Sequence, residues 1–100
     1  MDPRYNELAQ QLIRYSTSLK KGEKILLDLV DTPEAMAIAL IREVRARKGV
    51  PFLRLGANRL TRELMMGATD EQFKTTGKHL LTEMRDMDAY IAIRGAHNIN

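Results

Sequence analysis

Three short apolar runs alternate with longer amphipathic stretches along this chain. The runs "KILLDLV" (24–30), "VPFLRL" (50–55) and "AYIAI" (89–93) have the length of β-strands and show little polar alternation. Such runs are typical of strands in a parallel sheet that is covered on both faces. Before and between them, apolar residues recur at spacings of three and four, which predicts helices.

Start and stop signals bound the predicted helices, which we expect at residues 2–22, 33–48, 59–66 and 69–85. Lys20 and Lys21 would stand in the last turn of the first helix, where cations favour the helix dipole. Either Asp31 or Thr32 can cap the second helix. Thr69 and Gln72 form a capping-box pair at the start of the fourth.

Alternating strands and helices predict the α/β class. We expect one domain over residues 1–100, built as a small three-layer parallel sheet of three strands in the order 2-1-3, flanked by helices. The strand at 24–30 should be central, because it is the most apolar and precedes both right-handed crossovers. Both edges of so small a sheet would be open, which predicts self-association or further ordered chain there.

The helical periodicity also predicts which side chains are buried. In the helix at 33–48, the apolar face includes Ile38 and Ile41, and both are expected in the core. The last two helices each carry an apolar stripe that should face inward, consisting of Leu60, Leu64, Met65, Phe73, Leu80, Leu81 and Met84.

Composition narrows the classes of function. The chain has 44% hydrophobic residues, no cysteine and a net charge of +3, with 16 Lys and Arg spread among 13 Asp and Glu. The absence of cysteine excludes disulfides and thiolate chemistry. Because no run of like charge occurs, the charges indicate a solvated surface, and we expect no nucleic-acid partner. The first residues do not resemble a signal peptide and no run is long enough to span a membrane, so we expect a cytoplasmic protein without a membrane partner.

Residues for catalysis are sparse. His79 and His97 are the two histidines, and neither belongs to a metal-binding motif, so we expect no metal ligand in this chain. The turn after the first strand places Asp31 and Glu34 where a glycine-rich phosphate loop would be needed, and no P-loop or nucleophile elbow occurs. Asp28 interrupts an apolar strand. A buried carboxylate there is either a functional group or a structural one that accepts bonds from a neighbouring element.

Four segments together carry a resemblance to a known family. "MDPRYNELAQQLIRYSTSLKKGEKILLD", "TPEAMAIALIREVRARKGVPFLRL", "ATDEQF" and "MDAYIAIRGAHNIN" resemble, in this order and spacing, the amino-terminal segment of the thermophilic-type (leucyl) metalloaminopeptidases. The resemblance covers essentially all 100 residues. It implies a longer parent enzyme that removes amino-terminal residues from peptides with two divalent metal ions, zinc or cobalt, and that forms a homo-oligomer, usually a dimer.

In that family the metal ligands and the general base belong to a second, carboxy-terminal domain. The resemblance therefore implies no catalytic and no metal-binding residue in this chain, which we expect to be inactive alone and to shape the substrate cleft. Arg94, His97 and Asn98, after the last strand, are the residues expected to line that cleft. Two alternatives stay open: a stand-alone α/β protein-binding module without catalysis, and a small basic nucleic-acid-binding domain.

Overall fold

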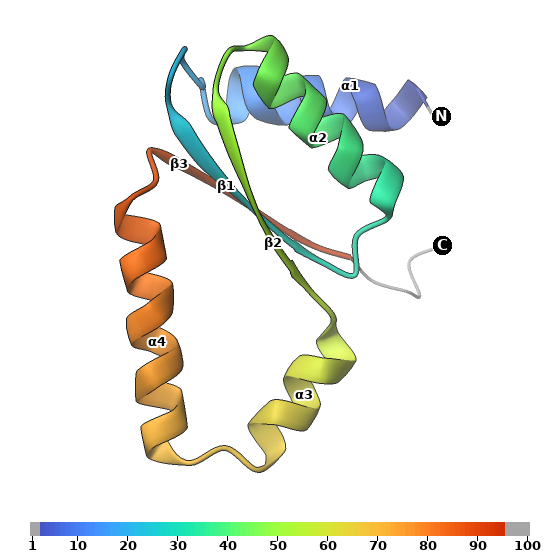
Figure 1. Cartoon of the computed structure of the whole chain (residues 1–100). Coiled ribbons are helices and arrows are strands. Elements are labelled where there is room, and N and C mark those ends of the chain that lie inside the picture. The colour runs from blue at the N-terminus through green and yellow to red at the C-terminus, as the bar shows by residue number, and fades with distance from the viewer. Residues whose placement is uncertain (1–2, 96–100) are drawn as a thin grey trace.

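The computed structural model describes residues 3–95 (Figure 1). Its elements are α1 (Pro3–Gln11), the π-helical turn η1 (Leu12–Ser16), β1 (Lys24–Val30), α2 (Glu34–Ala46), β2 (Val50–Gly56), α3 (Asn58–Met66), α4 (Asp70–Arg85) and β3 (Ala89–Arg94). Each strand lies within one residue of its predicted bounds. Within the described range, every helix is too short or too polar to cross a lipid bilayer.

The three strands form one parallel sheet in the order β2-β1-β3. Leu27 of β1 stands beside Leu53 of β2 and Ile91 of β3. The central strand is buried from Ile25 to Leu29. The predicted α/β class, strand order and central position of β1 are therefore confirmed.

The hydrophobic core lies on one face of this sheet. Alternation along β1 points Ile25, Leu27 and Leu29 to that face, where they pack against α1, η1 and α2. From α2, Leu40 and Val44 are fully buried in this cluster. Ile41 is half-buried and packs against the core, whereas Ile38 is half-buried and does not belong to the cluster. The prediction is thus confirmed for Ile41, which borders the core, and wrong for Ile38. The deepest side chains of α2 are Leu40 and Val44.

The first helix ends earlier than predicted. Regular α-helix stops at Gln11, and the chain then makes the turn η1. The hydroxyl of Thr17 donates to the carbonyl oxygen of Ile13 (2.8 Å), and Ser18 adopts a positive φ of 52°. Hydroxyl side chains that bond to the backbone offer the chain an alternative to further helix. As a result Leu19 turns back into the core, and Lys20 and Lys21 lie outside any helix.

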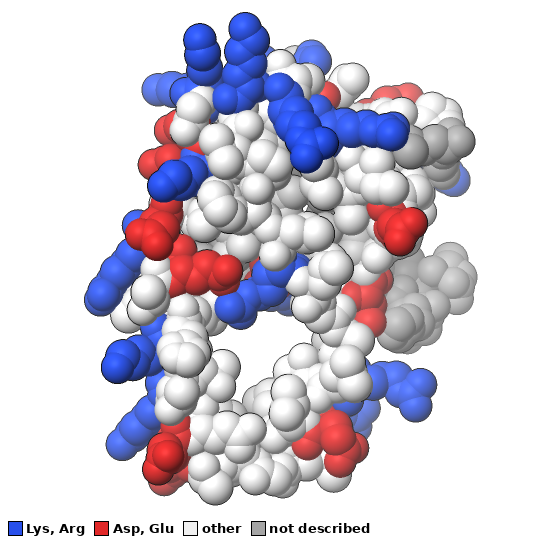
Figure 2. Space-filling view, in the orientation of Figure 1, with Lys and Arg blue, Asp and Glu red and all other residues white. Residues whose placement is uncertain are grey.

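The segment α3–α4 (58–85), which we call the arm, projects away from the sheet (Figure 1). Figure 2 shows an opening through the molecule between the arm and the sheet. The molecule measures 41 × 35 × 16 Å and has a radius of gyration of 14.9 Å, larger than the value of about 13 Å typical of a compact domain this size.

The predicted burial of the arm's apolar stripe is wrong. Leu60, Leu64 and Phe73 are 68%, 64% and 48% exposed, and Met65 and Leu81 are also exposed. Only Leu80 and Met84, near the end of α4, are half-buried. Periodicity correctly predicted that these segments are helices with an apolar side. A periodic pattern does not show, however, which other element packs against that side.

Of the predicted helix caps, the one at Thr69 is confirmed and the one at Asp31 is wrong. Thr69 Oγ1 accepts a hydrogen bond from the backbone N–H of Gln72 (3.1 Å), as predicted. Asp31, by contrast, does not cap α2, whose N-cap is Pro33 and has no side-chain hydrogen bond. Asp31 Oδ2 instead accepts from the backbone N–H of Asn58 (3.1 Å), at the start of α3. Asp31 has a positive φ of 52°, so the backbone turns sharply at the residue that makes this contact between two loops.

Candidate functional site

The second face of the sheet, opposite the core, is open toward the arm. Alternation in β1 points Leu26, Asp28 and Val30 to this face. The strand register places Arg54 beside Asp28, and Arg94 beside Val30. Polar and charged side chains thus gather on this face near the carboxyl ends of the strands, where open α/β sheets bind ligands.

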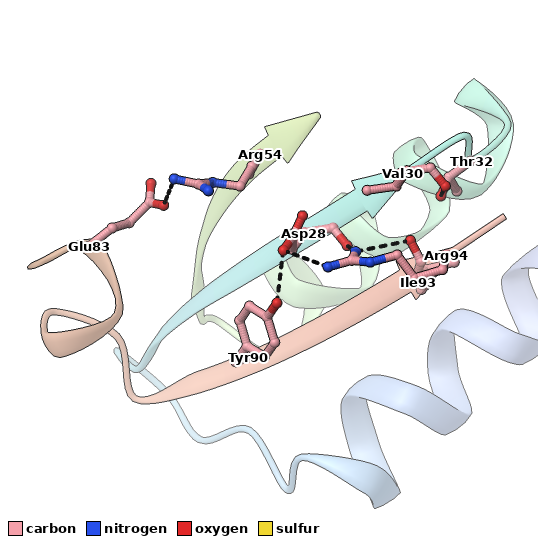
Figure 3. Close-up of polar contacts among 8 residues, drawn as sticks. All are labelled: Asp28, Val30, Thr32, Arg54, Glu83, Tyr90, Ile93 and Arg94. Atoms are coloured by element: carbon pink, nitrogen blue, oxygen red, sulfur yellow. Dashed lines mark hydrogen bonds and ion pairs between the residues drawn. The ribbon is translucent and has the colours of Figure 1, made fainter. Parts of the chain in front are cut away.

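Asp28 is the centre of this cluster (Figure 3). Its Oδ2 accepts hydrogen bonds from the hydroxyl of Tyr90 (2.8 Å) and from Nη2 of Arg94 (3.1 Å). Nη1 of Arg94 also donates to the backbone oxygen of Asp28 (3.1 Å). Asp28 is only 7% exposed, and a buried carboxylate is costly unless it is paired and hydrogen-bonded. Tyr90 and Arg94, both on β3, supply that pairing.

The charges in the cluster affect one another. The hydrogen bond to Asp28, followed by burial, raises the pKa of Tyr90 above the ordinary tyrosine value of about 10. The hydrogen bond to Asp28 likewise raises the pKa of Arg94. Tyr90 therefore stays protonated and acts as a hydrogen-bond donor at neutral pH, not as a base.

A second ion pair connects the sheet to the arm. Nη2 of Arg54 on β2 lies 2.8 Å from Oε1 of Glu83 on α4 (Figure 3), without the geometry of a hydrogen bond. Both side chains are roughly one-third exposed. Ion pairs with this much exposure contribute about 0–1 kcal/mol, so this pair orients the end of α4 more than it stabilises the fold.

Between these two ion pairs lies a hollow of about 530 Å³, the sheet hollow. Asp28, Arg54 and Arg94 line it from the strands, while Thr61 of α3 and Leu80 of α4 line it from the arm. Because each charge already has a partner, the hollow suits a ligand group that both donates and accepts hydrogen bonds, such as a peptide unit. Its lining residues include no nucleophile that stands beside a base.

Gly95 lies where β1 and β3 end and the strand order reverses, which is the topological switch point of this sheet. Its backbone N–H donates to the carbonyl oxygen of Val30 (2.7 Å). A Cβ at Gly95 would lie 2.0 Å from the carbonyl oxygen of Asp31. Any side chain here would collide with backbone, so the close approach of the two strand ends requires glycine.

The residues that the structure describes do not form a metal centre. Within residues 3–95, no group of three or more histidine, cysteine, aspartate or glutamate side chains converges. The buried carboxylates have protein partners: Asp28 as above, and Glu43, whose Oε2 lies 2.9 Å from Nε of Arg14. We therefore derive no metal-dependent step from these residues, and the expectation that this chain binds no metal remains a prediction.

The structure places one of the three expected cleft residues. Arg94 belongs to the Asp28 cluster on the open face. His97 and Asn98 lie outside the described residues. His79 is exposed on α4 and belongs to no group of metal-ligating side chains among the described residues. Sequence reasoning missed Tyr90 and Arg54 as neighbours of Asp28, although alternation along three parallel strands would have placed all of them on one face.

No protein-family model matches this sequence, and no curated protein matches it either.

Proposed function

We propose that this chain is the amino-terminal domain of a metal-dependent aminopeptidase, and that it shapes the substrate cleft without taking part in the chemistry. The sequence resemblance over all 100 residues motivates this proposal. The structural observation that carries it is the inner face of the arm, by which we mean Leu64, Met65, Phe73 and Leu80. Leu64, Met65 and Phe73 are about half to two-thirds exposed and line a hollow of about 470 Å³. Leu80 lines the sheet hollow.

An apolar face of this kind is characteristic of a surface that packs against further protein. In the proposed parent enzyme, the catalytic domain covers the inner face of the arm and holds two zinc or cobalt ions. The present chain contributes the sheet whose carboxyl edge, with Arg94 and the sheet hollow, lies beside the peptide substrate. The parent enzyme acts in the cytoplasm as a homo-oligomer.

The same inner face supports the second candidate, a stand-alone protein-binding module. Such a module would use the arm to bind a partner protein and would have no peptidase activity. The two candidates differ in whether the protein that carries this sequence also carries a catalytic domain.

Capture of the native protein separates them. A tag is introduced at the amino terminus in the source cell, and the captured protein is assayed for release of amino acids from aminoacyl-nitroanilides. The enzyme proposal expects a polypeptide much larger than 11.4 kDa, with activity that a chelator abolishes and that zinc or cobalt restores. A captured polypeptide of 100 residues without such activity would favour the binding module and overturn the enzyme proposal.

A further inference from the structure

Two loops and the turn η1, at the amino-terminal edge of the sheet, bring five cationic side chains around one open hollow of about 620 Å³, the basic hollow. Figure 2 shows lysine and arginine side chains gathered at this end of the molecule, at the top of the view. The first loop precedes β1 and the second joins α2 to β2. The five side chains are Arg14, Lys20, Lys21, Arg47 and Lys48.

The backbone holds these two loops together. The N–H of Gly22 donates to the carbonyl oxygen of Lys48 (2.8 Å), and the N–H of Val50 donates to the carbonyl oxygen of Glu23 (2.8 Å). Leu19, which is 1% exposed, packs so closely on Gly49 that a Cβ there would lie 2.6 Å from its Cδ2. The attachment points of the four loop cations are therefore fixed relative to one another.

Most of this positive charge is not neutralised by the protein. Arg14 pairs with Glu43 at 2.9 Å. The carboxylate of Glu23 accepts from the backbone N–H of Lys20 at 2.7 Å. In the part of the chain that the structure describes, the ammonium and guanidinium groups of the remaining four cations form no ion pair.

The helix dipole explains only part of the cluster. Arg47 and Lys48 follow α2 and can interact favourably with its carboxyl end. Lys20 and Lys21 lie in a turn outside any helix. Like charges that converge without such a reason repel one another, and a bound anion would relieve that repulsion.

We propose that the basic hollow binds a compact polyphosphate group. Several phosphate oxygens match the combination of lysine point charges with the donor fork of Arg47. The cations surround one hollow instead of following a line, and no aromatic side chain or side-chain amide lines it. A single-stranded nucleic acid would need an extended charged groove with aromatic stacking platforms, so the arrangement favours a compact ligand. This site lies at the edge of the sheet opposite the sheet hollow and does not depend on the proposed peptidase role.

Calorimetric titration of the 100-residue chain with inorganic tripolyphosphate tests the proposal. The double variant Lys20→Gln/Lys48→Gln removes two charges from the basic hollow. Its matched control, Lys74→Gln/Lys78→Gln, removes two exposed charges from α4. Thermal melts of both variants check that the fold is intact.

We expect saturable one-to-one binding that weakens as salt is added. The basic-hollow variant should raise the dissociation constant by about tenfold or more, since it removes two charged donors of hydrogen bonds to the phosphate oxygens. The control variant should leave it within about twofold, as expected for a distant, screened charge. No saturable binding, an equal loss in the control variant, or displacement of tripolyphosphate by a single-stranded oligonucleotide of equal phosphate concentration would each overturn the proposal.

Discussion

At the scale of single residues, Asp28 shows how a carboxylate is held within an apolar strand. It is buried on the open face of the sheet and receives the hydroxyl of Tyr90 and the guanidinium of Arg94 from the neighbouring strand. Removing one partner of a buried charge pair generally costs more than the pair itself contributes, because a charge is left without compensation. Asp28, Tyr90 and Arg94 should therefore behave as one unit.

Tyrosine titration tests this unit. Because hydrogen bonding to Asp28 raises the pKa of Tyr90, a near-ultraviolet absorbance titration should contain a late component that ionises above the ordinary tyrosine value of about 10. Tyr90→Phe should remove this late component, and Asp28→Asn should move it to lower pH. A late component that persists in Tyr90→Phe would contradict the assignment, and Tyr15→Phe serves as the exposed control.

The same shift predicts the direction of a pH effect on stability. The folded-state pKa of Tyr90 is higher than the unfolded-state value of about 10. Its contribution is therefore complete below pH 10 and is lost as the pH rises through the folded-state pKa. Urea unfolding should show a steeper loss of stability above about pH 10 in the wild type than in Tyr90→Phe. Equal slopes would mean that the hydrogen bond does not form.

Burial on the core face predicts the cost of a cavity. Leu40 is fully buried and Leu60 is 68% exposed, so the same substitution should cost much more stability at Leu40 than at Leu60. Leu40→Ala should lower the free energy of unfolding by about 2–5 kcal/mol, while Leu60→Ala should change it by less than about 0.5 kcal/mol. Urea melts with equal losses for both would contradict the placement of the arm outside the core.

At the scale of elements, the sequence correctly predicted those features of the fold that depend on interactions between residues close together in the chain. The three strands, the core face of α2 and the Thr69 cap followed from apolar runs, helical spacing and a capping pair. The early end of α1 was missed, because periodicity does not register the hydroxyl of Thr17 that bonds to the backbone or the positive φ of Ser18. The exposure of the arm was also missed. The apolar pattern of a helix is the same whether the residues that pack against it belong to this chain or to another protein.

The candidate site was predicted only in part, and for a related reason. Asp28 and Arg94 were each noticed in the sequence, but they are separated by 66 residues. The contact between them depends on the strand order and register. The basic hollow was missed for the same reason, since its cations come from η1 and two loops, and no run of charge in the sequence joins them.

Gly77 tests whether the stability of α4 depends on the helix propensity of its own residues. It lies in the middle of α4, and a Cβ there would meet no atom within 4 Å. Gly77→Ala should therefore stabilise the helix by about 1 kcal/mol. Hydrogen exchange of the α4 amides should slow accordingly. Unchanged or faster exchange in α4 would mean that the residue does not have the helical, open environment described here.

At the scale of the whole molecule, one face of the sheet is covered by packed helices and the other face is largely uncovered. α1, η1 and α2 cover one face, while the arm stands off the other and leaves an opening (Figure 2). Segments with few buried apolar contacts open at low free energy. In the isolated chain, backbone amides of α3 and α4 should thus exchange much faster than those of β1 and α2. The proposal that the arm packs against a catalytic domain predicts that the difference disappears in the native protein.

Hydrogen exchange of the arm, measured by mass spectrometry on the isolated 100-residue chain and on the protein captured from its source cell, tests that proposal most directly. We expect the peptides of α3 and α4 to exchange rapidly in the isolated chain and to become protected in the captured protein, with the protection concentrated at Leu64, Met65 and Phe73. Equal, rapid exchange of the arm in both samples would contradict the proposal that a catalytic domain covers its inner face.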